Sequence, residues 1–268
     1  MLKGKKIVLG VTGGIAVYKA VDLVSKLRKQ GAEVRVVMTE HAQQFVTPLT
    51  FKEISGNKVA VSMWNANQEF NVEHIALADW ADLFMVVPAT ANIIAKMAYG
   101  IADDLLSTTL LAAHSPVIVC PAMNTHMYEN PATQENIAKI KSRGIVVMPP
   151  ASGVLACGAV GAGRLPEPAD IVNFVKDFFA KTEGDMRGLK VLVTAAGTRE
   201  PIDPVRYVGN RSSGKMGYSI AQAAAERGAE VTLVTGPSAL TPPPNIKVVN
   251  VETTQQMMDA CLAVYDGC

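Results

Sequence analysis

The stretch KIVLGVTGGIAVYKAVDLV, residues 6–24, decides how the first part of the chain folds. It begins with a short apolar run, turns at two glycines and continues into a helix-length segment that reaches residue 30 and closes at Gly31. Glycine directly after the last helical residues is a common helix stop, because it adopts the left-handed conformation without strain. The stretch therefore predicts a strand, a tight turn and a helix, which together open a βαβ unit.

Similar apolar runs recur along the first part of the chain. The five runs are KIVLGV, VRVVMT, LFMVVPA, VIVCPAM and IVVMPP. Helix-length segments fall at residues 93–97, 105–113 and 133–143, and the last of them closes at Gly144. Continuous runs of Val, Ile and Leu suit strands that are buried on both faces. Strands that alternate with helices predict an α/β fold, a flavodoxin-like or Rossmann-like parallel sheet in three layers. Ligands of such sheets bind beyond the carboxyl ends of the strands.

The pattern restarts after a polar stretch, KDFFAKTEGDMRGLK, which ends at Lys190. LKVLVTAAGT and the later GKMGYSIAQAAAERGAEVTLVTGP repeat the opening order of strand, glycine turn, helix, GAEV and second strand. We therefore expect a first domain at residues 1–180, a linker at 181–188 and a second Rossmann-like domain at 189–268. About 80 residues are short of the usual size of such a domain, so we expect the second one to be incomplete.

Composition limits the classes of partner and compartment. The chain has 268 residues and a formal net charge of +1, without a basic stripe for nucleic acid or an anionic membrane. We expect small-molecule partners. The four cysteines include no CxxC pair, which argues against a zinc site or a disulfide framework and for reduced thiols in a cytoplasm.

The glycine turn after the first strand is a candidate phosphate site. Thr12, Gly13 and Gly14 lie between a strand and a helix, where backbone N–H groups and the helix dipole favour an anion. A turn needed only for tight strand-to-helix packing fits the same residues equally well. The turn departs from GxGxxG, so FMN, which has a single terminal phosphate, fits it better than NAD.

Several longer strings resemble known proteins. NVEHIALADWADLFMVVPATANIIAKMAYGIADDLLSTTLLA, PAMNTHMYENPAT and SGVLACGAVGAGRLPEP are similar to the flavin-containing cysteine decarboxylases, and this resemblance covers nearly all of residues 5–180. LVTAAGTREPIDPVRYVGNRSSGKMG, residues 192–217, resembles the start of the ligase domain that is fused behind the bacterial decarboxylase. The chain is therefore identified as a member of the bifunctional coenzyme A biosynthesis flavoproteins, with its ligase part incomplete.

The resemblance implies an activity and its cofactors. The expected reaction is the FMN-dependent decarboxylation of N-[(R)-4-phosphopantothenoyl]-L-cysteine to 4′-phosphopantetheine. It implies that the substrate thiol is oxidised as two electrons pass to FMN, that carbon dioxide leaves, and that the same flavin reduces the resulting enethiol. A complete ligase domain would join 4′-phosphopantothenate to cysteine with CTP and Mg²⁺. No metal site is expected in the chain itself.

The resemblance also assigns catalytic roles to residues that local reading leaves open. His74 follows an acidic residue at the start of a helical run, and by itself it is best interpreted as a surface or helix-start residue. The resemblance implies instead that His74 is the base that accepts the thiol proton of the substrate. Asn124 reads locally as a turn former, and the resemblance assigns it to the substrate carboxylate. Cys157, in a glycine-dense stretch likened to a mobile substrate clamp, becomes the proton donor, whereas Cys120 reads as inert core.

Further polar residues in the matching strings are candidate ligands of the flavin or the substrate. Single Ser and Thr residues at helix starts are often only caps. The resemblance implies a set of flavin ligands, namely Thr12, Gly13, Gly14, Thr39, Thr90, Asn92 and Ser107. It also implies that Met127 and Arg164 bind the substrate. For Arg164, a solvated surface charge fits nearly as well. Asn210 resembles the ligase asparagine that handles the acyl-nucleotide intermediate.

The resemblance implies assembly, and rival functions remain open. Members of the family form trimers, and the bifunctional bacterial forms are dodecamers built from trimers, with the flavin at subunit contacts. The alternative function is a regulatory FMN-binding protein of the same fold, against which the presence of His74, Asn124 and Cys157 argues. A flavin prenyltransferase and a nicotinamide-dependent dehydrogenase fit less well, because of the motif PAMNxxMY and the missing GxGxxG.

Overall fold

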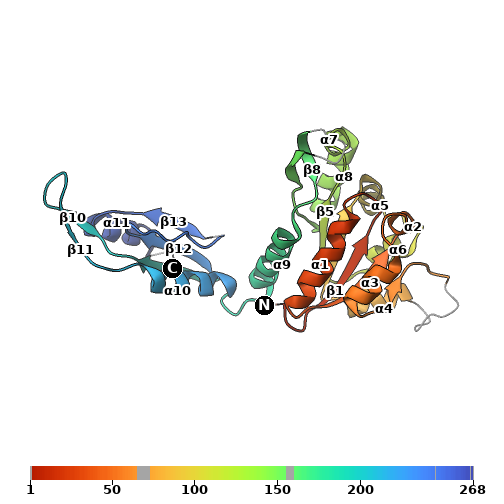
Figure 1. The fold of residues 1–268 in the computed structure, drawn as a ribbon, viewed down its shortest axis with the longest axis horizontal. Coiled ribbons are helices and arrows are strands. Elements are labelled where there is room, and N and C mark those ends of the chain that lie inside the picture. The colour runs from red at the N-terminus through yellow and green to blue at the C-terminus, as the bar shows by residue number, and fades with distance from the viewer. Residues whose placement is uncertain (1, 65–72, 155–159, 245, 266, 268) are drawn as a thin grey trace. The chain divides into compact units, whose positions relative to one another are not determined.

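The computed structural model describes residues 2–64, 73–154, 160–244, 246–265 and 267. The chain forms two compact units, residues 1–174 and 175–268 (Figure 1). Helix α9 (Pro168–Glu183) contains the boundary between them, so residues 181–183 of the expected linker are helical.

A parallel sheet forms the centre of the first unit. Its strands are β1 (Lys6–Val11), β2 (Glu33–Met38), β3 (Val59–Ala60), β4 (Leu83–Ala89), β5 (Val117–Pro121) and β6 (Val146–Val147), in the order β3-β2-β1-β4-β5-β6. The five predicted runs are confirmed as β1, β2, β4, β5 and β6. The sequence did not predict β3, because this strand has only two residues, too few for a recognisable apolar run. The full order is that of a Rossmann sheet, and without the short β3 it is that of a flavodoxin-like sheet.

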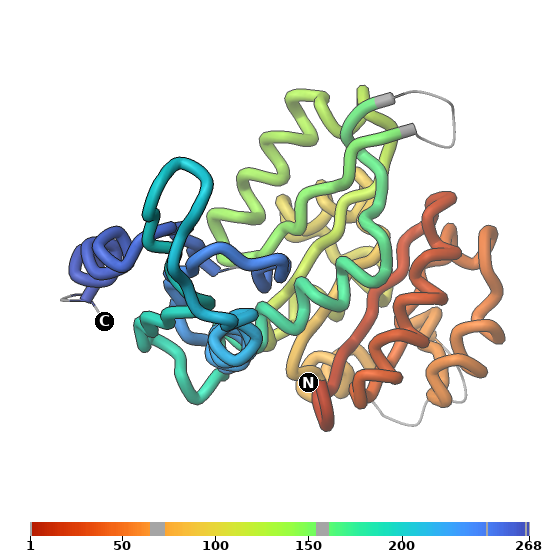
Figure 2. Tube along the Cα trace, turned by 60° about the vertical axis from the view of Figure 1, so that its left-hand side comes forward, coloured from red at the N-terminus to blue at the C-terminus, as the bar shows by residue number. Residues whose placement is uncertain are grey.

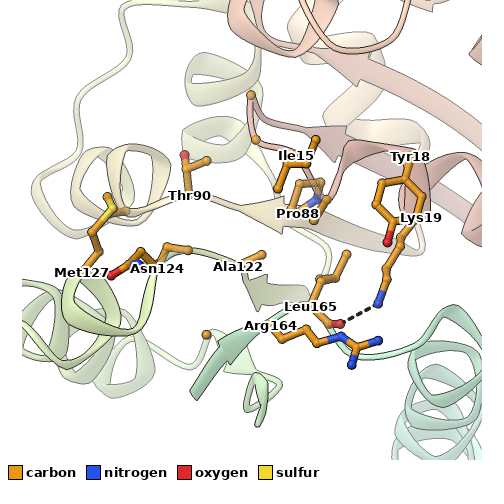
Figure 3. A pocket seen from close by; sticks show the side chains of 16 residues that line it. Ile15, Tyr18, Lys19, Pro88, Thr90, Ala122, Asn124, Met127, Arg164 and Leu165 are labelled. Carbon is orange, nitrogen blue, oxygen red and sulfur yellow. Dashed lines mark hydrogen bonds between the residues drawn. The ribbon is translucent and has the colours of Figure 1, made fainter. Parts of the chain in front are cut away.

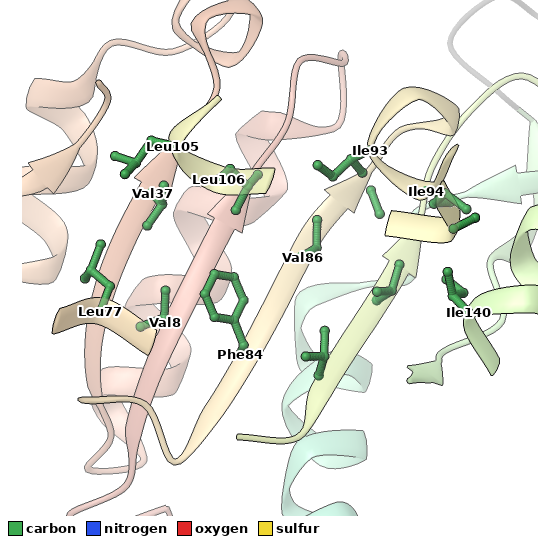
Figure 4. Packing of buried hydrophobic residues seen from close by; sticks show 14 of the residues in the cluster. Val8, Val37, Leu77, Phe84, Val86, Ile93, Ile94, Leu105, Leu106 and Ile140 are labelled. Carbon is green, nitrogen blue, oxygen red and sulfur yellow. The ribbon is translucent and has the colours of Figure 1, made fainter. Parts of the chain in front are cut away.

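Helices cover both faces of this sheet and give the predicted three layers. They are α1 (Val17–Lys29), α2 (Glu40–Gln43), α3 (Pro48–Ser55), α4 (Glu73–Trp80), α5 (Ala91–Tyr99), α6 (Leu105–Ala112), α7 (Thr125–Glu129) and α8 (Pro131–Ser142). On one face α4, α5, α6 and α8 bury apolar side chains such as Leu77, Leu106 and Ile140 against Phe84 and Val86 of β4 (Figure 4). Helices α1 and α3 pack together on the other face. The predicted stops are confirmed: Gly31 and Gly144 follow α1 and α8 with φ of +90° and +85°.

An antiparallel hairpin joins the sheet to helix α9. Its arms are β7 (Ala151–Val154) and β8 (Val160–Arg164), which lie side by side in Figure 2. The sequence did not predict this hairpin, because its glycine-dense arms carry no alternating apolar pattern. Strand β8 packs against the short helix α7, which follows β5.

The second unit repeats the opening arrangement of the first. Strands β9 (Lys190–Ala195), β12 (Glu230–Thr235) and β13 (Lys247–Asn250) form a parallel sheet in the order β13-β12-β9. Helix α10 (Lys215–Glu226) follows β9 after the antiparallel hairpin of β10 (Arg199–Pro201) and β11 (Tyr207–Gly209), and α11 (Thr254–Tyr265) follows β13. Gly217 of α10 packs against β9 so closely that a Cβ there would lie 2.6 Å from the Cβ of Ala195.

Burial on strand β5 predicts an unreactive thiol at Cys120. Its side chain is fully buried, which raises the pKa of the thiol to about 12. At pH 8, iodoacetamide is expected to label the half-buried Cys261 and to leave Cys120 unlabelled until denaturant unfolds the first unit. Peptide-resolved mass spectrometry measures both sites in one sample, and labelling of Cys120 at the rate of Cys261 would contradict the fold.

Candidate functional site

The loops after β1 and β4 meet at the carboxyl edge of the first sheet, where the strand order reverses. The hydroxyl of Thr12 donates to the carbonyl of Pro88 (2.7 Å) and accepts from the N–H of Thr90 (3.2 Å). Thr12 is 2% exposed, so this pair of bonds ties the two loops together out of water. A parallel sheet binds its ligands beside such a reversal point.

The first of two cavities at this edge has a volume of about 640 Å³, and we name it the Asn124 cavity (Figure 3). Its walls come from the loops after β1, β4 and β5, from α1 and from β8. It is lined by Gly13, Gly14, Ile15, Ala16, Tyr18, Lys19, Pro88, Thr90, Ala91, Ala122, Met123, Asn124, Met127, Gly163, Arg164 and Leu165.

The second cavity, which we name the Thr39 cavity, has a volume of about 620 Å³. It is lined by Thr12, Gly13, Thr39, Glu40, His41, Thr90, Ala91, Asn92, Ile93, Lys96, Asp103, Asp104 and Met127. The two cavities share Gly13, Thr90, Ala91 and Met127 and therefore adjoin. Together they give the edge of the sheet enough room for a ligand of cofactor size and a second small molecule.

The helices around these cavities differ in how their amino ends are satisfied. Thr39, Thr90 and Asn124 are N-caps, which accept from backbone N–H groups of Ala42 (3.3 Å), Ile93 (3.5 Å) and His126 (2.9 Å). Helix α1 has no side-chain cap and no acidic residue in its first turn. Its amino end, which follows Gly13 and Gly14, is therefore the one that an anion best satisfies.

The two glycines of the turn after β1 differ in the space around them. A Cβ on Gly13 would lie 2.5 Å from the Cβ of His41, so Gly13 is needed for close packing. A Cβ on Gly14 would meet only the methyl of Thr90, at 3.8 Å, and Gly14 lines the Asn124 cavity. Both glycines line the Asn124 cavity, and only Gly14 has open space where a side chain would start.

The two cavities differ in charge. Among the described residues, the Asn124 cavity is lined by two cations, Lys19 and Arg164, and by no carboxylate, although both cations contact Glu167 outside the lining. The Thr39 cavity is lined by Lys96 together with the carboxylates of Glu40, Asp103 and Asp104. The Asn124 cavity is therefore the better environment for an anionic small molecule.

Lys96 joins α5 to the start of α6 in the wall of the Thr39 cavity. Its ammonium contacts Asp103 Oδ1 (2.6 Å) and Asp104 Oδ2 (2.8 Å). Asp104 also caps α6: its Oδ1 accepts from the N–H of Ser107 (2.8 Å), and the Ser107 hydroxyl accepts from the N–H of Asp104 (3.1 Å). Burial alone would raise the pKa of Asp104, but the hydrogen bonds from Lys96 and Ser107 outweigh it and hold this pKa below its usual value.

The structure brings several of the predicted site residues together. Asn124, Met127 and Arg164 line the Asn124 cavity beside Gly13 and Gly14, and Thr12, Thr39, Thr90 and Asn92 line the adjoining one. The turn interpretation of Asn124 is confirmed, since its Oδ1 caps α7.

Other predicted residues lie elsewhere. Ser107 is not among the lining residues, and its hydroxyl serves the cap of α6. His74 lies on α4, which packs against α6, and is not among the described residues that line either cavity. Asn210 lies in the second unit, where its side chain is next to Gly197. Cys157 lies outside the described residues.

Sequence reasoning missed the part of the wall that α1 contributes. Ile15 and Tyr18 line the Asn124 cavity and are 63% and 61% exposed, and Lys19 lines it from a buried position. A signal for Lys19 was present: it lies four residues before Leu23, on the apolar stripe that α1 buries. A lysine on the buried face of a helix needs a specific partner.

Comparisons with known proteins give the family. Residues 1–180 match the Flavoprotein family, and residues 186–268 match the DNA/pantothenate metabolism flavoprotein C-terminal domain. Coenzyme A biosynthesis bifunctional protein CoaBC of Vibrio vulnificus is 51% identical over 98% of this chain and 65% of its own length. The same-named protein of Haemophilus influenzae is 50% identical over 100% of this chain and 68% of its own. The chain thus spans about two thirds of the length of these relatives.

Solved structures resemble the first unit. A PPC decarboxylase mutant complexed with pantothenoylaminoethenethiol has a TM-score of 0.58 and 32% identity over 65% of this chain and 98% of its own. The FMN binding protein AtHal3 has a TM-score of 0.56 and 32% identity over 66% of this chain and 97% of its own.

Two classes of feature are missing from the described part of the chain. Within residues 2–64, 73–154, 160–244, 246–265 and 267, no helix has the length and apolar character to span a membrane. In the same residues, no three His, Cys, Asp or Glu side chains gather as ligands for a metal ion.

The Lys96–Asp104 contact predicts a stability difference that depends on pH. Asp104→Asn keeps the cap acceptor and loses the ion pair, so it is expected to lower the unfolding free energy at pH 7 by about 0.5–1 kcal/mol. Because the pKa of Asp104 is lowered in the folded state, this contribution is present above the usual carboxyl pKa and is lost as pH falls through the folded value.

Urea unfolding from pH 7 down to pH 3 measures this difference. Tryptophan fluorescence reports the first unit alone, because Trp64 and Trp80 are the two tryptophans of the chain. Asp22→Asn, at an exposed pair on α1, is the matched control and is expected to change stability less. A difference of constant size across the pH range would contradict the ionic role of Asp104.

Proposed function

Because the chain belongs to the Flavoprotein family and to the coenzyme A biosynthesis bifunctional proteins, we propose that its first unit decarboxylates N-[(R)-4-phosphopantothenoyl]-L-cysteine to 4′-phosphopantetheine with FMN. The observation that carries this proposal is the Asn124 cavity, which joins Asn124 and Met127 of PAMNxxMY to the glycine turn after β1. An apolar cavity with a few polar groups and two cations suits a small anionic substrate.

The residues at the edge of the sheet fit FMN. The uncapped amino end of α1 after Gly13 and Gly14 suits a terminal phosphate, and Thr39, Thr90 and Asn92 offer polar side chains in the adjoining cavity. When bound, FMN supplies a two-electron acceptor and donor. Thr12 contributes by holding the β1 and β4 loops together. Ser107 as a flavin ligand stays a prediction, since its hydroxyl serves the α6 cap.

Asn124 is assigned to the substrate carboxylate. Its Oδ1 accepts from the N–H of His126, which fixes the amide so that Nδ2 is the atom to face the carboxylate. A neutral amide orients a carboxylate without the strong charge pairing that would stabilise the ground state. Met127 and Arg164 line the same cavity and complete the proposed substrate contacts.

His74 and Cys157 are the proposed proton-transfer residues. An imidazole can accept the thiol proton of the substrate near neutral pH, and a thiol can return a proton to the enethiol. The roles rest on the family resemblance of HIALADWADL and ACGAVGAGR, and that of Cys157 falls outside the described residues.

For the second unit we propose the opening part of the CTP-dependent phosphopantothenate–cysteine ligase. Its family match and Asn210 support this assignment, and CTP and Mg²⁺ are expected only with a complete ligase domain. The domain limits 1–180 and 189–268 and the cytoplasmic location remain predictions.

The decarboxylase proposal predicts product without an added oxidant. Anaerobic incubation of the FMN-loaded protein with phosphopantothenoylcysteine is expected to yield carbon dioxide and 4′-phosphopantetheine, detected by mass spectrometry. Cys157→Ser is expected to lower 4′-phosphopantetheine formation about 100-fold or more and to leave at most one enethiol per flavin, because the two electrons then stay on FMN. A yellow protein without turnover would instead favour the regulatory FMN-binding protein.

We also propose that copies assemble as trimers, which group into dodecamers in the complete bifunctional protein, and that one copy supplies His74 to the site of another. Two observations support this. His74 is not among the described residues that line the Asn124 or Thr39 cavity of its own chain, and Ile15 and Tyr18 leave large apolar surface exposed on the Asn124 cavity.

Complementation between inactive variants tests this shared site. His74→Asn and Asn124→Ala homo-oligomers are each expected to be inactive, whereas co-expressed mixed oligomers regain activity in sites that combine an intact Asn124 with an intact His74. Sedimentation measures the oligomer size of each preparation. Mixed oligomers that form and stay inactive would refute the shared site.

A further inference from the structure

We propose that Lys19 is a positioning residue for the substrate: from helix α1 it fastens the carboxyl end of β8 and so sets where Arg164 and Asn124 stand in the Asn124 cavity. This inference rests on the proposed decarboxylase function and deepens it. It concerns a residue that binds other parts of the protein rather than the reacting atoms.

Lys19 is buried and satisfied by the segment directly after β8. Its side chain is 8% exposed, and its ammonium donates to the carbonyl of Leu165 (3.2 Å) and to Glu167 Oε1 (2.9 Å) (Figure 3). A buried ammonium is costly unless its protons are bonded. Displacing residues 165–167 would therefore leave the charge of Lys19 uncompensated, which holds the segment in place.

Glu167 connects Lys19 to Arg164. The same Oε1 that accepts from Lys19 also accepts from Arg164 Nη2, at 2.6 Å. The hydrogen bond and charge of Lys19, followed by the charge of Arg164, lower the pKa of Glu167 and so stabilise its ionised form. Arg164, although 44% exposed, is thus tied to a carboxylate whose own position Lys19 fixes.

Strand β8 in turn packs on the backbone around Asn124. The N–H of Met123 donates to the carbonyl of Gly163 (2.9 Å). A Cβ on Gly161 would lie 2.7 Å from the side chain of Thr125, and a Cβ on Gly163 would overlap the carbonyl oxygen of Met123. These glycines serve close approach, so any shift of β8 passes to the residues on either side of Asn124.

A direct role is the alternative to positioning. Lys19 lines the cavity, so its ammonium could attract an anionic substrate without any effect through β8. The two roles differ in what they require of Glu167, which is not among the lining residues. Positioning requires its carboxylate, whereas a direct attraction grows stronger when the carboxylate is removed.

Kinetics of Lys19→Met and Glu167→Gln separate the two roles. Positioning predicts that both variants raise KM for phosphopantothenoylcysteine about 10- to 100-fold, with a smaller change in kcat and less than a twofold change in the Kd of FMN. Lys19→Arg is expected to recover part of the loss, because it can still donate to Glu167. Lys26→Met is the matched control, because Lys26 lies on the same helix and pairs with exposed Asp22.

Trypsin supplies a readout that does not depend on turnover. Leu165 is 2% exposed, so the bond after Arg164 is expected to resist cleavage in the wild type and in Lys26→Met. Mass spectrometry measures the rate of cleavage after Arg164, which is expected to be higher in Lys19→Met and Glu167→Gln.

The outcomes divide clearly. An unchanged or lower KM in Glu167→Gln would establish the direct role and overturn positioning. Unchanged cleavage after Arg164 in Lys19→Met and Glu167→Gln would also overturn positioning. A rise in the Kd of FMN equal to the rise in KM would also overturn positioning, because it would show that the variant disrupts the whole cavity. If Lys19→Met does not fold, Glu167→Gln and Lys19→Arg carry the same comparison. Absent turnover by the wild type would refute the proposed function, while the cleavage rates would still test the contact.

Discussion

The pairing of β1 with β4 is the constraint on which the first unit depends. These strands are far apart in sequence, and their register runs from Ile7 opposite Leu83 to Gly10 opposite Val86. At the carboxyl end the Thr12 hydroxyl continues the connection by bonding both to Pro88 and to Thr90. Because chain connections turn away from each other on either side of this pair, the loops after the two strands leave a depression between them. Both cavities open beside it.

The helices around this depression differ in whether a side chain caps their amino ends. Threonine, asparagine and aspartate caps satisfy α2, α5, α6, α7 and α8, so these helices begin at fixed points of the cavity walls. Helix α1 follows the glycine turn without such a cap, which suits its amino end to the proposed phosphate. Residues such as Thr39, Thr90 and Asn124 therefore serve the fold and the proposed site at once.

Glycine works in this protein chiefly through close approach. Gly13 lets the β1 loop touch His41, and Gly161 and Gly163 let β8 lie on the loop that carries Asn124. Gly217 brings α10 onto β9 in the second unit in the same manner. The absence of a side chain at these positions fixes distances between backbones, and the walls of the Asn124 cavity depend on those distances.

The sequence by itself determined five of the six strands of the first sheet, several of its helices, the helix stops at Gly31 and Gly144, the sheet type and the family. Those features depend on local conformational preference, on apolar periodicity and on motifs such as PAMNxxMY, all of which are contained in short stretches. Only the tertiary structure decided that His74, among the described residues, lines neither the Asn124 cavity nor the Thr39 cavity, and that Lys19 reaches the segment after β8. These contacts join residues up to 148 positions apart, and strand order and crossover connections bring such residues together, which no local pattern encodes.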